Sequence, residues 1–567
     1  MGLALGAVLA LAALLPGIGR PAAGQAAAPE RRVVRIPLPK DDGSLTPYSF
    51  QLGYPLLTLV YDTLLWRDPS GVPQPWLATG VEISANATRF TVRLDPKARW
   101  HDGRPLTAED VRFTFRHVAT RPSPRFSAEV TQVDKVTVQD PATVVITTKR
   151  PSPGFADQTL ADLPILPAHL WQAVPQGQAT PAGLPVGSGP YRLTERLPDG
   201  GYRFVANPDY HRGKPTVDEI VVPIIGDIGG TLAALTRRNI DMVPLRLPPD
   251  DLRRVDGLTT KVARGTGYLG VQLVFNVRRP PFDDAAVRRS VSQAIDLKRL
   301  ATTVGDVEPA EQGLLHPESR FAPGRALKVT DEVAARAALA PLSQRGQPIE
   351  ILTADNDPVQ LETARQVALA LERAGVPARS QPRPVAEVNR LLGFDGAPPD
   401  FTLAVSLLPA TASYDPDFLA RLFGSATATT SGYASPAFDA AALKVATTTD
   451  PAARKVAAAE ELALLATELP ALPLLFPNGA YAYYPAAHDG WRYVRGIGIL
   501  DKQSFLPAGE QPAEGPTATT TPAEAPAAPV PVPRRGTGKG FPFIVVPAGM
   551  VAAAVVLMGL ALYRRRG

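Results

Sequence analysis

The sequence predicts an α/β protein of more than one lobe, extended by a single transmembrane helix near its C-terminus. Segments of strand and helix periodicity alternate along the second half of the chain, which is typical of α/β folds. About 480 residues lie between the two ends, too many for one hydrophobic core and suited to two or three lobes. An uncharged run of 23 residues, 541–563, is long enough to cross a bilayer as a helix.

The elements follow from local patterns, taken in chain order. Strands are expected where apolar runs are short or alternate with period two, and helices where apolar residues recur over three or more turns. The expected strands are 33–38, 90–94, 136–138, 144–147, 220–225, 349–352 and 401–405. The clearest expected helices are 55–65, 107–118, 284–295, 358–374 and 452–469.

The N-terminus has the pattern of a secretory signal, which we assign to residues 1–28. An apolar run from Leu3 to Ile18 is followed by small residues that offer cleavage sites. One feature departs from the pattern, because the first basic residue, Arg20, comes after the apolar run. The bulk of the chain is therefore expected outside the cytoplasm.

The C-terminal part predicts a stalk and an anchor. Residues 506–540 form a linker rich in Pro, Ala and Thr, with eight prolines between Pro507 and Pro533, and such a composition does not fold into a core. The run 541–563 is then a transmembrane helix, closed by Arg564–Arg566. With the chain exported, the sequence predicts a single-pass cell-membrane protein with a short cytoplasmic tail.

Composition excludes several classes of function. The net charge of +5 is small for 567 residues and gives no reason to expect nucleic-acid binding. There is no cysteine, which excludes disulfides and thiol catalysis. The six histidines lie far apart without metal-ligand spacing, so no metal or other cofactor is expected. With no catalytic constellation, the sequence does not predict an enzyme.

Seven motifs in a fixed order carry a resemblance to a known family. The most specific is RWHDGRPLTAEDVRFTFRHV, at 99–118, which reads as a turn and a helix capped by Thr107 and Asp110. The others lie at 165–171, 185–191, 207–215, 239–242, 275–296 and 431–439. Together they resemble the family 5 extracellular solute-binding proteins, the peptide and nickel receptors of ABC importers.

The resemblance implies a two-lobed, periplasmic-binding-protein-like fold of type II, with an extra subdomain on the first lobe. It places lobe 1 at 30–267, lobe 2 at 268–477 and a return to lobe 1 at 478–505. Glycines at the two crossings, such as Gly267, could absorb the change in backbone dihedrals when the lobes close. The chain lacks the lipidated cysteine of many such receptors, which a C-terminal anchor would explain.

The resemblance also indicates where a ligand would bind. Peptide-binding members hold the ligand's amino group with an aspartate, and this chain has Ala412 at that position. Asp415 either replaces that aspartate or caps the helix that begins at Pro416. The candidate ligand-binding residues are Tyr48, Phe50 and Gln51 of an early loop, Tyr268 at a crossing, and Thr411, Ser413, Tyr414 and Asp415.

The function implied is that of a membrane-anchored receptor outside the cytoplasm. It would bind a peptide or peptide-like small solute between its lobes and deliver it to the permease and ATPase subunits of an ABC importer by hinge closure. An anchored ligand sensor or scaffold of the same fold, without a transport role, is the alternative. The absence of an acidic residue at position 412 predicts weak binding of peptides with free amino termini.

Overall fold

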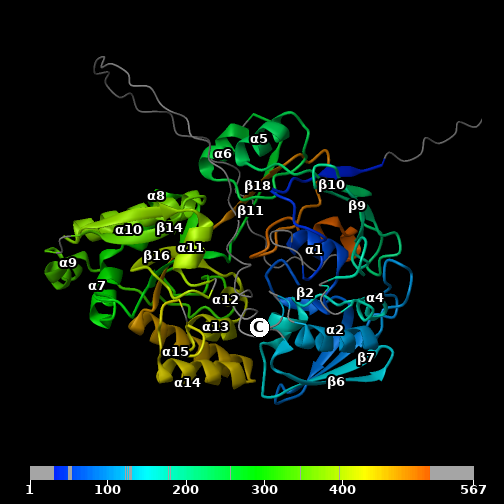
Figure 1. The fold of residues 1–567 in the computed structure, drawn as a ribbon, viewed down its shortest axis with the longest axis horizontal. Coiled ribbons are helices and arrows are strands. Elements are labelled where there is room, and N and C mark those ends of the chain that lie inside the picture. Colours follow the sequence, from blue (N-terminus) through cyan, green and yellow to red (C-terminus); the bar gives the residue numbers. More distant parts are fainter. Residues whose placement is uncertain are drawn as a thin grey trace, which may run out of the picture.

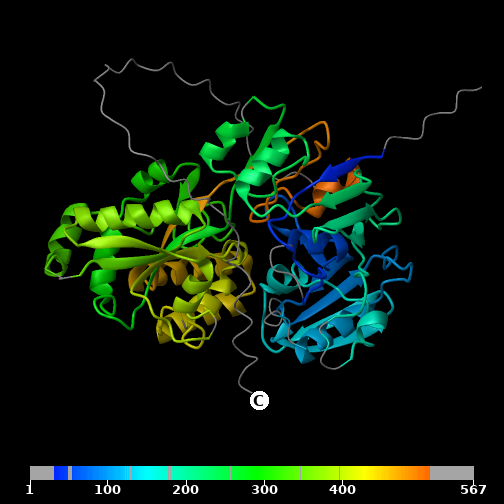
Figure 2. The ribbon, with the colours of Figure 1, turned by 45° about the horizontal axis from the view of Figure 1, so that its top comes forward.

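Two lobes face each other in the computed structural model (Figure 1). The structure describes residues 31–510 except 49–53, 122, 124–125, 127–129, 176–177, 179, 256, 345–346, 395 and 429. The predicted signal sequence at 1–28 and most of the predicted linker lie outside the described residues. Figure 2 shows the same two lobes from a second direction, with the segment that carries α5 and α6 above their junction.

Lobe 1 is built on a four-stranded sheet in the order β1-β10-β9-β8, in which β1 pairs in parallel with β10. Two smaller pairs, β2-β3 and β11-β18, complete it. Its strands are β1 (Val33–Arg35), β2 (Leu65–Arg67), β3 (Pro73–Pro75), β8 (Tyr191–Arg196), β9 (Tyr202–Ala206), β10 (Glu219–Val222), β11 (Lys261–Gly265) and β18 (Gly479–Tyr483). Its helices and short helical turns are α1 (Tyr54–Val60), η1 (Ala156–Leu160), α4 (Ala168–Trp171), α5 (Ile228–Thr236), α6 (Pro249–Val255), η4 (Lys502–Phe505) and η5 (Ala508–Glu510).

An antiparallel sheet in the order β4-β5-β7-β6 forms a subdomain on lobe 1, with α2 (Ala108–Thr120) packed on it. Its strands are β4 (Ala78–Ile83), β5 (Arg89–Leu94), β6 (Val133–Asp140) and β7 (Thr143–Thr148). The inward residues of β5, Phe90, Val92 and Leu94, are buried and alternate with more exposed ones. They join one continuous hydrophobic core with lobe 1, so the subdomain is part of that lobe.

Lobe 2 is a six-stranded mixed sheet in the order β13-β17-β12-β16-β14-β15, covered by helices on both faces. Its strands are β12 (Gly270–Phe275), β13 (Val307–Pro309), β14 (Ile349–Ala354), β15 (Ala378–Arg383), β16 (Leu403–Leu408) and β17 (Ala471–Pro477). Leu403 and Val405 of β16 face one core, and Ala404 faces the other. Because both faces are buried in the middle of the sheet, the central strands β12, β16 and β17 are mostly apolar, whereas the edge strand β15 is mostly polar.

The helices of lobe 2 divide between the two cores. The first core contains buried side chains of α7 (Ala285–Ala294), α8 (Leu297–Val304), α9 (Glu332–Leu339), continued by η2 (Ala340–Leu342), and α10 (Pro358–Arg373). The second contains those of α11 (Val385–Leu391), α12 (Thr411–Tyr414), α13 (Leu419–Phe423), α14 (Pro436–Thr447) and α15 (Pro451–Glu468), with η3 (Pro416–Phe418) beside α12. Aspartate caps start several of them. Asp357, for example, accepts hydrogen bonds from the amides of Val359 and Gln360.

The first helix ends earlier than its sequence pattern predicts. The pattern favours a helix over 55–65, but α1 ends at Val60, and Leu65–Arg67 form β2. This short strand pairs with Pro73–Pro75, and the indole of Trp66 donates a hydrogen bond to Asp501 at 3.0 Å. Tertiary pairing here overrides local periodicity.

The motifs of lobe 1 hold one another together, and we call this set of contacts the motif joint. The ring of His101 bonds the carbonyl of Gly189 at 3.0 Å, and that of His169 bonds the carboxylate of Asp102 at 2.7 Å. The capping residue Asp110 accepts from the amide of Thr107 and, with its second oxygen, from the amide of Ala168, both at 2.9 Å. The predicted capping of the helix by Thr107 and Asp110 is therefore part of the network of contacts that joins these motifs.

The return segment is anchored in lobe 1 by a fully buried lysine. The ammonium of Lys502 lies 2.7 Å from the carboxylate of Asp62 and sits over the rings of Trp66 and Trp76, at 4.1 and 4.6 Å from their centroids. Trp76 also donates to Asp62, at 2.8 Å. Burial alone would raise the pKa of Asp62, but Lys502 and His211 lower it to about 2.

The predicted C-terminal transmembrane helix is not supported, which corrects the fold class given above. Crossing a bilayer takes about 20 consecutive, mostly apolar residues. No helix in the described part of the chain meets that requirement. The longest of them, α15, has 18 residues and carries charges such as Arg454 and Glu461. The run 541–563 lies outside the described residues. The predicted single-pass membrane location depended on this helix and is therefore not supported either.

Candidate functional site

The two lobes are joined by two crossings that touch each other. One runs from β11 to β12 and the other from β17 to β18. A β-carbon on Gly267 would lie only 2.0 Å from the carbonyl oxygen of Pro477, so the first crossing packs directly on the backbone of the second. Only glycine fits such a close approach. The two crossings therefore lie side by side where the chain passes between the lobes, and we call this place the hinge.

On lobe 2, the chain that follows β16 turns into α12 and η3 and faces lobe 1. Asp415 caps η3 by accepting from the amide of Asp417 at 2.9 Å. Its carboxylate also forms two hydrogen bonds with the guanidinium of Arg454, at 2.7 and 2.8 Å, and the residue is fully buried. The carboxylate of Asp415 is therefore engaged by groups of its own chain.

Two tyrosines next to the hinge carry contacts between the lobes. Tyr268 and Tyr414 pack at 5.4 Å between ring centroids, and the guanidinium carbon of Arg67 lies 3.9 Å from the centroid of Tyr414. The hydroxyl of Tyr414 donates to the carbonyl of Arg495, and the carboxylate of Glu318 pairs with Arg495 at 2.5 Å. Arg67 and Arg495 belong to lobe 1, so this cluster crosses the gap between the lobes.

A second cluster of interlobe contacts, which we call the interlobe latch, is formed by polar side chains. Arg320 of lobe 2 pairs with Asp157 of lobe 1. Gln158 of lobe 1 donates to Asp415 at 3.4 Å and accepts from Arg421 of lobe 2 at 2.9 Å. Burial raises the pKa of Asp157, and the arginines on either side only partly oppose that shift.

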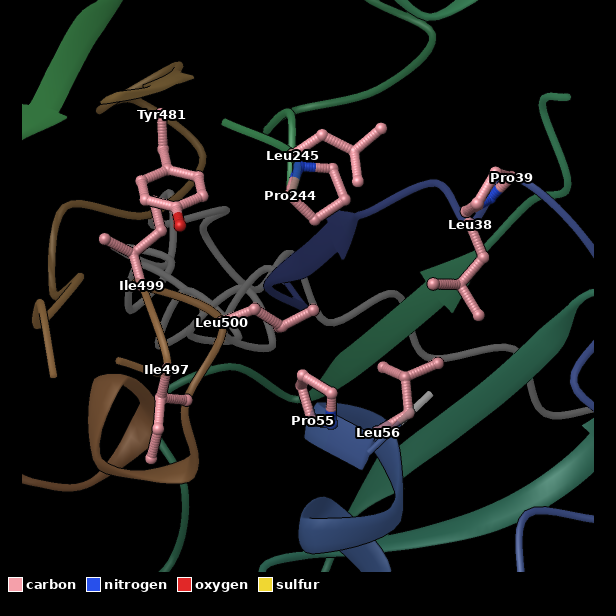
Figure 3. A pocket seen from close by; sticks show the side chains of 10 residues that line it. All are labelled: Leu38, Pro39, Pro55, Leu56, Pro244, Leu245, Tyr481, Ile497, Ile499 and Leu500. Carbon is pink, nitrogen blue, oxygen red and sulfur yellow. The ribbon is translucent and has the colours of Figure 1, made fainter. Parts of the chain in front are cut away.

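A cavity of about 100 Å³ opens on the lobe 1 side of the hinge (Figure 3). Its walls come from the ends of β1 and α1, from the segment that follows α5, and from the return segment. They are almost wholly apolar, with one hydroxyl, that of Tyr481. The lining residues are Leu38, Pro39, Pro55, Leu56, Pro244, Leu245, Tyr481, Ile497, Ile499 and Leu500. Such a surface suits an apolar group of a ligand.

The structure brings some of the predicted site residues together and separates others. Tyr268, Tyr414 and Asp415 all lie at the interlobe face, beside Thr411 at the start of α12. Ser413 is buried within lobe 2, where its hydroxyl accepts a hydrogen bond from the amide of His316 at 3.0 Å. Ala412 is fully buried.

Tyr48 lies in the wall of lobe 1 rather than at the interlobe face. Its hydroxyl donates to the carbonyl of Arg121 at 2.8 Å, and its ring packs on His117 and Trp171. Phe50 and Gln51 lie outside the described residues. Within the described residues, no group of three or more His, Asp or Glu side chains is arranged to hold a metal ion.

Sequence reasoning missed the cavity and, apart from Asp415, the residues of the interlobe latch. Four separate segments supply the cavity, and its residues are ordinary prolines and aliphatic side chains. The latch residues Asp157 and Gln158 lie in η1, which had no motif. Only the motif at 239–242 ends close to the cavity, since Pro244 lies two residues after its last residue, Met242.

Two lobes, a double crossing and a cavity beside the hinge define a two-lobed binding protein. The comparisons place the chain within that class: residues 72–431 match the model of the bacterial extracellular solute-binding proteins, family 5. The chain belongs to this family.

Relatives in sequence are distant. A candidate ABC transporter peptide-binding protein of Brucella ovis is 28% identical over 351 residues, which cover 59% of this chain and 65% of that protein. The di/tripeptide-binding protein 2 of Pseudomonas aeruginosa is 28% identical over 246 residues, 39% of this chain and 46% of that protein. The chain thus matches less than two thirds of the length of these relatives.

Solved structures match over most of the described chain. The ABC transporter substrate-binding protein CtaP of Listeria monocytogenes aligns with a TM-score of 0.74 at 21% identity, covering 84% of this chain and 99% of that one. The oligopeptide-binding protein AppA of Bacillus subtilis, in complex with a nonapeptide, gives 0.69 at 20% identity, with 83% and 99% covered. NikA of Brucella suis, with Fe(III)-EDTA, gives 0.71 at 21% identity, with 82% and 98% covered. At these identities the likeness establishes the fold.

Proposed function

We propose that this protein is a solute receptor that acts outside the cytoplasm, binds a peptide or peptide-like small solute between its lobes, and delivers it to an ABC permease and ATPase. The observation that carries the proposal is the hinge: two lobes joined by two touching crossings, with an apolar cavity beside them. Family membership and the peptide-binding relatives support the same conclusion.

Delivery rests on closure of the lobes. A ligand shifts the balance toward the closed form only through contacts that the open form lacks. The ion pair between Arg320 and Asp157 is one of the contacts that the open form lacks, because its partners lie on different lobes. Such contacts lower the free energy that the ligand itself must supply to close the lobes. The importer then recognises the closed form.

The ligand's chemistry is constrained by the groups that could meet an ammonium. Asp415 is already bound to Arg454, position 412 is alanine, and no carboxylate lines the cavity. An ammonium enclosed without a counter-charge loses its hydration with no compensation. We therefore expect a ligand whose amine is blocked or missing, in place of an ordinary peptide with a free amino terminus.

Native mass spectrometry of the purified full chain tests the proposal, since a receptor that closes on its ligand can retain it through purification. Calorimetry then compares Leu-Leu with N-acetyl-Leu-Leu, and we expect tighter binding of the acetylated peptide. Submicromolar binding of unblocked peptides that is lost in Asp415→Asn would overturn the expected ligand class.

Transport is tested separately by deleting the gene and measuring uptake of the ligand so identified. We expect uptake to fall. Unchanged uptake, with binding intact in the purified protein, would contradict delivery to an importer and favour a ligand-sensing role.

A further inference from the structure

Carboxyl groups of both lobes gather where η1 of lobe 1 meets η3 of lobe 2, and we call Asp157, Asp415, Asp417 and Glu461 the carboxylate cluster. The backbone of lobe 1 covers part of it. A β-carbon built on Gly154, just before η1, would lie 2.6 Å from a carboxylate oxygen of Asp417 and 3.0 Å from both of Asp415. Figure 1 shows α12, which leads into η3, on the side of lobe 2 that faces lobe 1. Separating the lobes would therefore return these two aspartates to water.

One guanidinium is shared between the two aspartates. Nη2 of Arg454 lies 2.7 Å from Asp415 and 2.8 Å from Asp417. Asp415 accepts two hydrogen bonds from Arg454, whereas Oδ1 of Asp417 is buried and accepts none. Among the described residues no other cation pairs with Asp417. The positive charge of Arg454 thus balances one carboxylate of the two.

Glu461 shows that the cluster can hold a proton. It is fully buried on α15, and neither of its carboxyl oxygens has a hydrogen-bond partner in the described part of the chain. Burial raises its pKa well above the ordinary value, the charges of Asp417 and Asp415 add to that shift, and Arg454 opposes it only in part. Its neighbours Ala458 and Leu462 belong to the second core of lobe 2, so Glu461 stays enclosed and neutral in both positions of the lobes.

Asp417 differs from Glu461 because it lies at the edge of the cluster. Its side chain is 17% exposed, which lets it exchange protons with the solvent. Burial and the charge of Asp415 raise its pKa to about 7, against the opposing charges of Arg454 and Arg150. When the lobes separate, Asp417 regains water and its pKa falls toward the ordinary value of about 4. The proton therefore stabilises the closed form in mild acid, and this contribution is lost as the pH rises through about 7.

The other charged groups do not reverse this sign. Asp157 pairs with Arg320 and lies 3.4 Å from Arg67, yet its burial and the charge of Asp415 raise its pKa as well. Arginines stay charged throughout this range of pH. The charged groups in and around the cluster are Asp415, Glu461, Arg454, Arg320 and Arg421 of lobe 2, and Asp157, Arg67 and Arg150 of lobe 1.

We propose that closure of the lobes takes up a proton at Asp417, so that mild acid favours the closed, solute-holding form and a pH above neutral favours release. This inference rests on the proposed function and adds to it a control over closure. The proton acts as a second ligand, because it binds the closed form more tightly than the open form.

The test follows the interlobe distance of the full chain as the pH changes, with no ligand added. Spin labels on Ile83→Cys of lobe 1 and Val333→Cys of lobe 2, both exposed positions, report that distance by pulsed electron resonance. Between pH 5.5 and 8 we expect the ratio of closed to open molecules to fall by about tenfold or more, because each unit of pKa difference corresponds to a factor of ten.

Three variants locate the proton. Asp417→Asn is neutral at every pH, so it should keep the high, acid-side ratio across the whole range. Asp283→Asn removes an exposed aspartate of lobe 2 and should keep the full pH dependence. Glu461→Gln should keep it too, because Glu461 is already neutral.

An interlobe distance that does not change with pH in the unmodified protein would overturn the proposal, and so would a pH dependence that survives in Asp417→Asn. Loss of the dependence in Glu461→Gln would place the proton at Glu461 and overturn it as well. These results would leave the receptor function standing, since that is tested by the retained ligand and by uptake. If no ligand is retained and uptake is unchanged, the receptor function fails, and with it the role of the proton in solute release.

Discussion

The motif joint and the interlobe face differ in what the sequence says about them. The joint ties together three of the motifs that carry the family resemblance, through His101, His169 and Asp110. The interlobe face is built from side chains such as Asp157, Arg320 and Arg421, none of which lies in those motifs. In this chain three of the seven motifs hold lobe 1 together, and these interlobe contacts lie outside all seven. Predictions for the two regions therefore concern different measurements, stability for one and closure for the other.

The largest effect is expected inside lobe 1. Lys502→Met leaves the buried carboxylate of Asp62 without its cation, and breaking a buried pair on one side costs about 3–5 kcal/mol. Urea unfolding, followed by fluorescence of the buried tryptophans, measures this loss.

The matched control is Lys214→Met, which removes an exposed lysine that pairs with Asp218 four residues away. We expect it to change stability by less than about 1 kcal/mol. If Lys502→Met behaves like Lys214→Met, the return segment is not anchored by its buried charge, and the contrast between the two regions weakens.

The elements of the fold could be predicted where local pattern and tertiary environment agree. Phe90 to Leu94 alternate in sequence and do so in β5, and Pro358 follows a capping aspartate and starts α10. The prediction failed for α1, because residues 65–67 pair with a strand that local periodicity does not reveal. The predicted membrane helix is not supported, since no helix in the described part of the chain is long and apolar enough to cross a bilayer.

Much less of the candidate site could be predicted. Tyr268, Tyr414 and Asp415 come from regions that the resemblance singled out, and all three lie between the lobes. The cavity could not be found, because its walls are prolines and aliphatic side chains from four distant segments, and residues of these types occur throughout the chain. Tyr48 packs against the core of lobe 1 through His117 and Trp171, and its role in ligand binding stays a prediction.

The motif joint should also govern stability in mild acid. Burial lowers the pKa of His101 to about 4, so between pH 6.5 and 4 the unfolded chain binds a proton that the folded protein does not. Stability is therefore lost as the pH falls through this range. His101→Gln should reduce the loss between pH 7 and 4 by about 1–3 kcal/mol, measured by urea unfolding at a series of pH values.

His211 provides a control of opposite sign. Its pKa is raised, because the hydrogen bonds and charges of Asp62 and Asp95 outweigh its burial, so its protonation favours the folded state. That contribution is complete below about pH 6.5 and is lost as the pH rises through the folded pKa. His211→Gln should remove the gain in stability that the unmodified protein shows as the pH falls toward 6.5, and it should leave the loss below pH 6.5 unchanged. A similar change of slope in both variants would contradict the assignment.

The hinge connects the two regions, and a substitution there should affect both measurements. Gly267→Ala places a β-carbon 2.0 Å from the carbonyl oxygen of Pro477, so the crossings must move apart at a cost of about 1–3 kcal/mol. Unfolding measurements and small-angle scattering should show lower stability and a larger radius of gyration. Gly80→Ala, at a position with open space for a β-carbon, should change neither. An unchanged radius in Gly267→Ala would show that the crossings tolerate separation without opening the lobes.

The smallest effect is expected at the interlobe latch, where closure changes and the stability of each lobe does not. Arg320→Gln removes the charge that pairs with Asp157 across the gap, and a hydrogen bond to a charged group contributes about 1.5–3 kcal/mol. Asp157 keeps Arg67 at 3.4 Å and also has a raised pKa, so a proton can replace part of the lost charge. We therefore expect the closed population to fall about tenfold, equivalent to about 1.4 kcal/mol.

The chain has no cysteine, so two introduced cysteines can be labelled without background. Spin labels at Ile83→Cys and Val333→Cys, two exposed positions on different lobes, report the interlobe distance by pulsed electron resonance. The control, Arg299→Gln, removes an arginine that pairs with Glu332 within lobe 2. A longer distance in Arg320→Gln but not in Arg299→Gln would show that the latch holds the lobes closed. The same distance in both would mean that the Arg320–Asp157 pair does not hold them closed, and that closure depends on the hinge and the aromatic cluster around Tyr414.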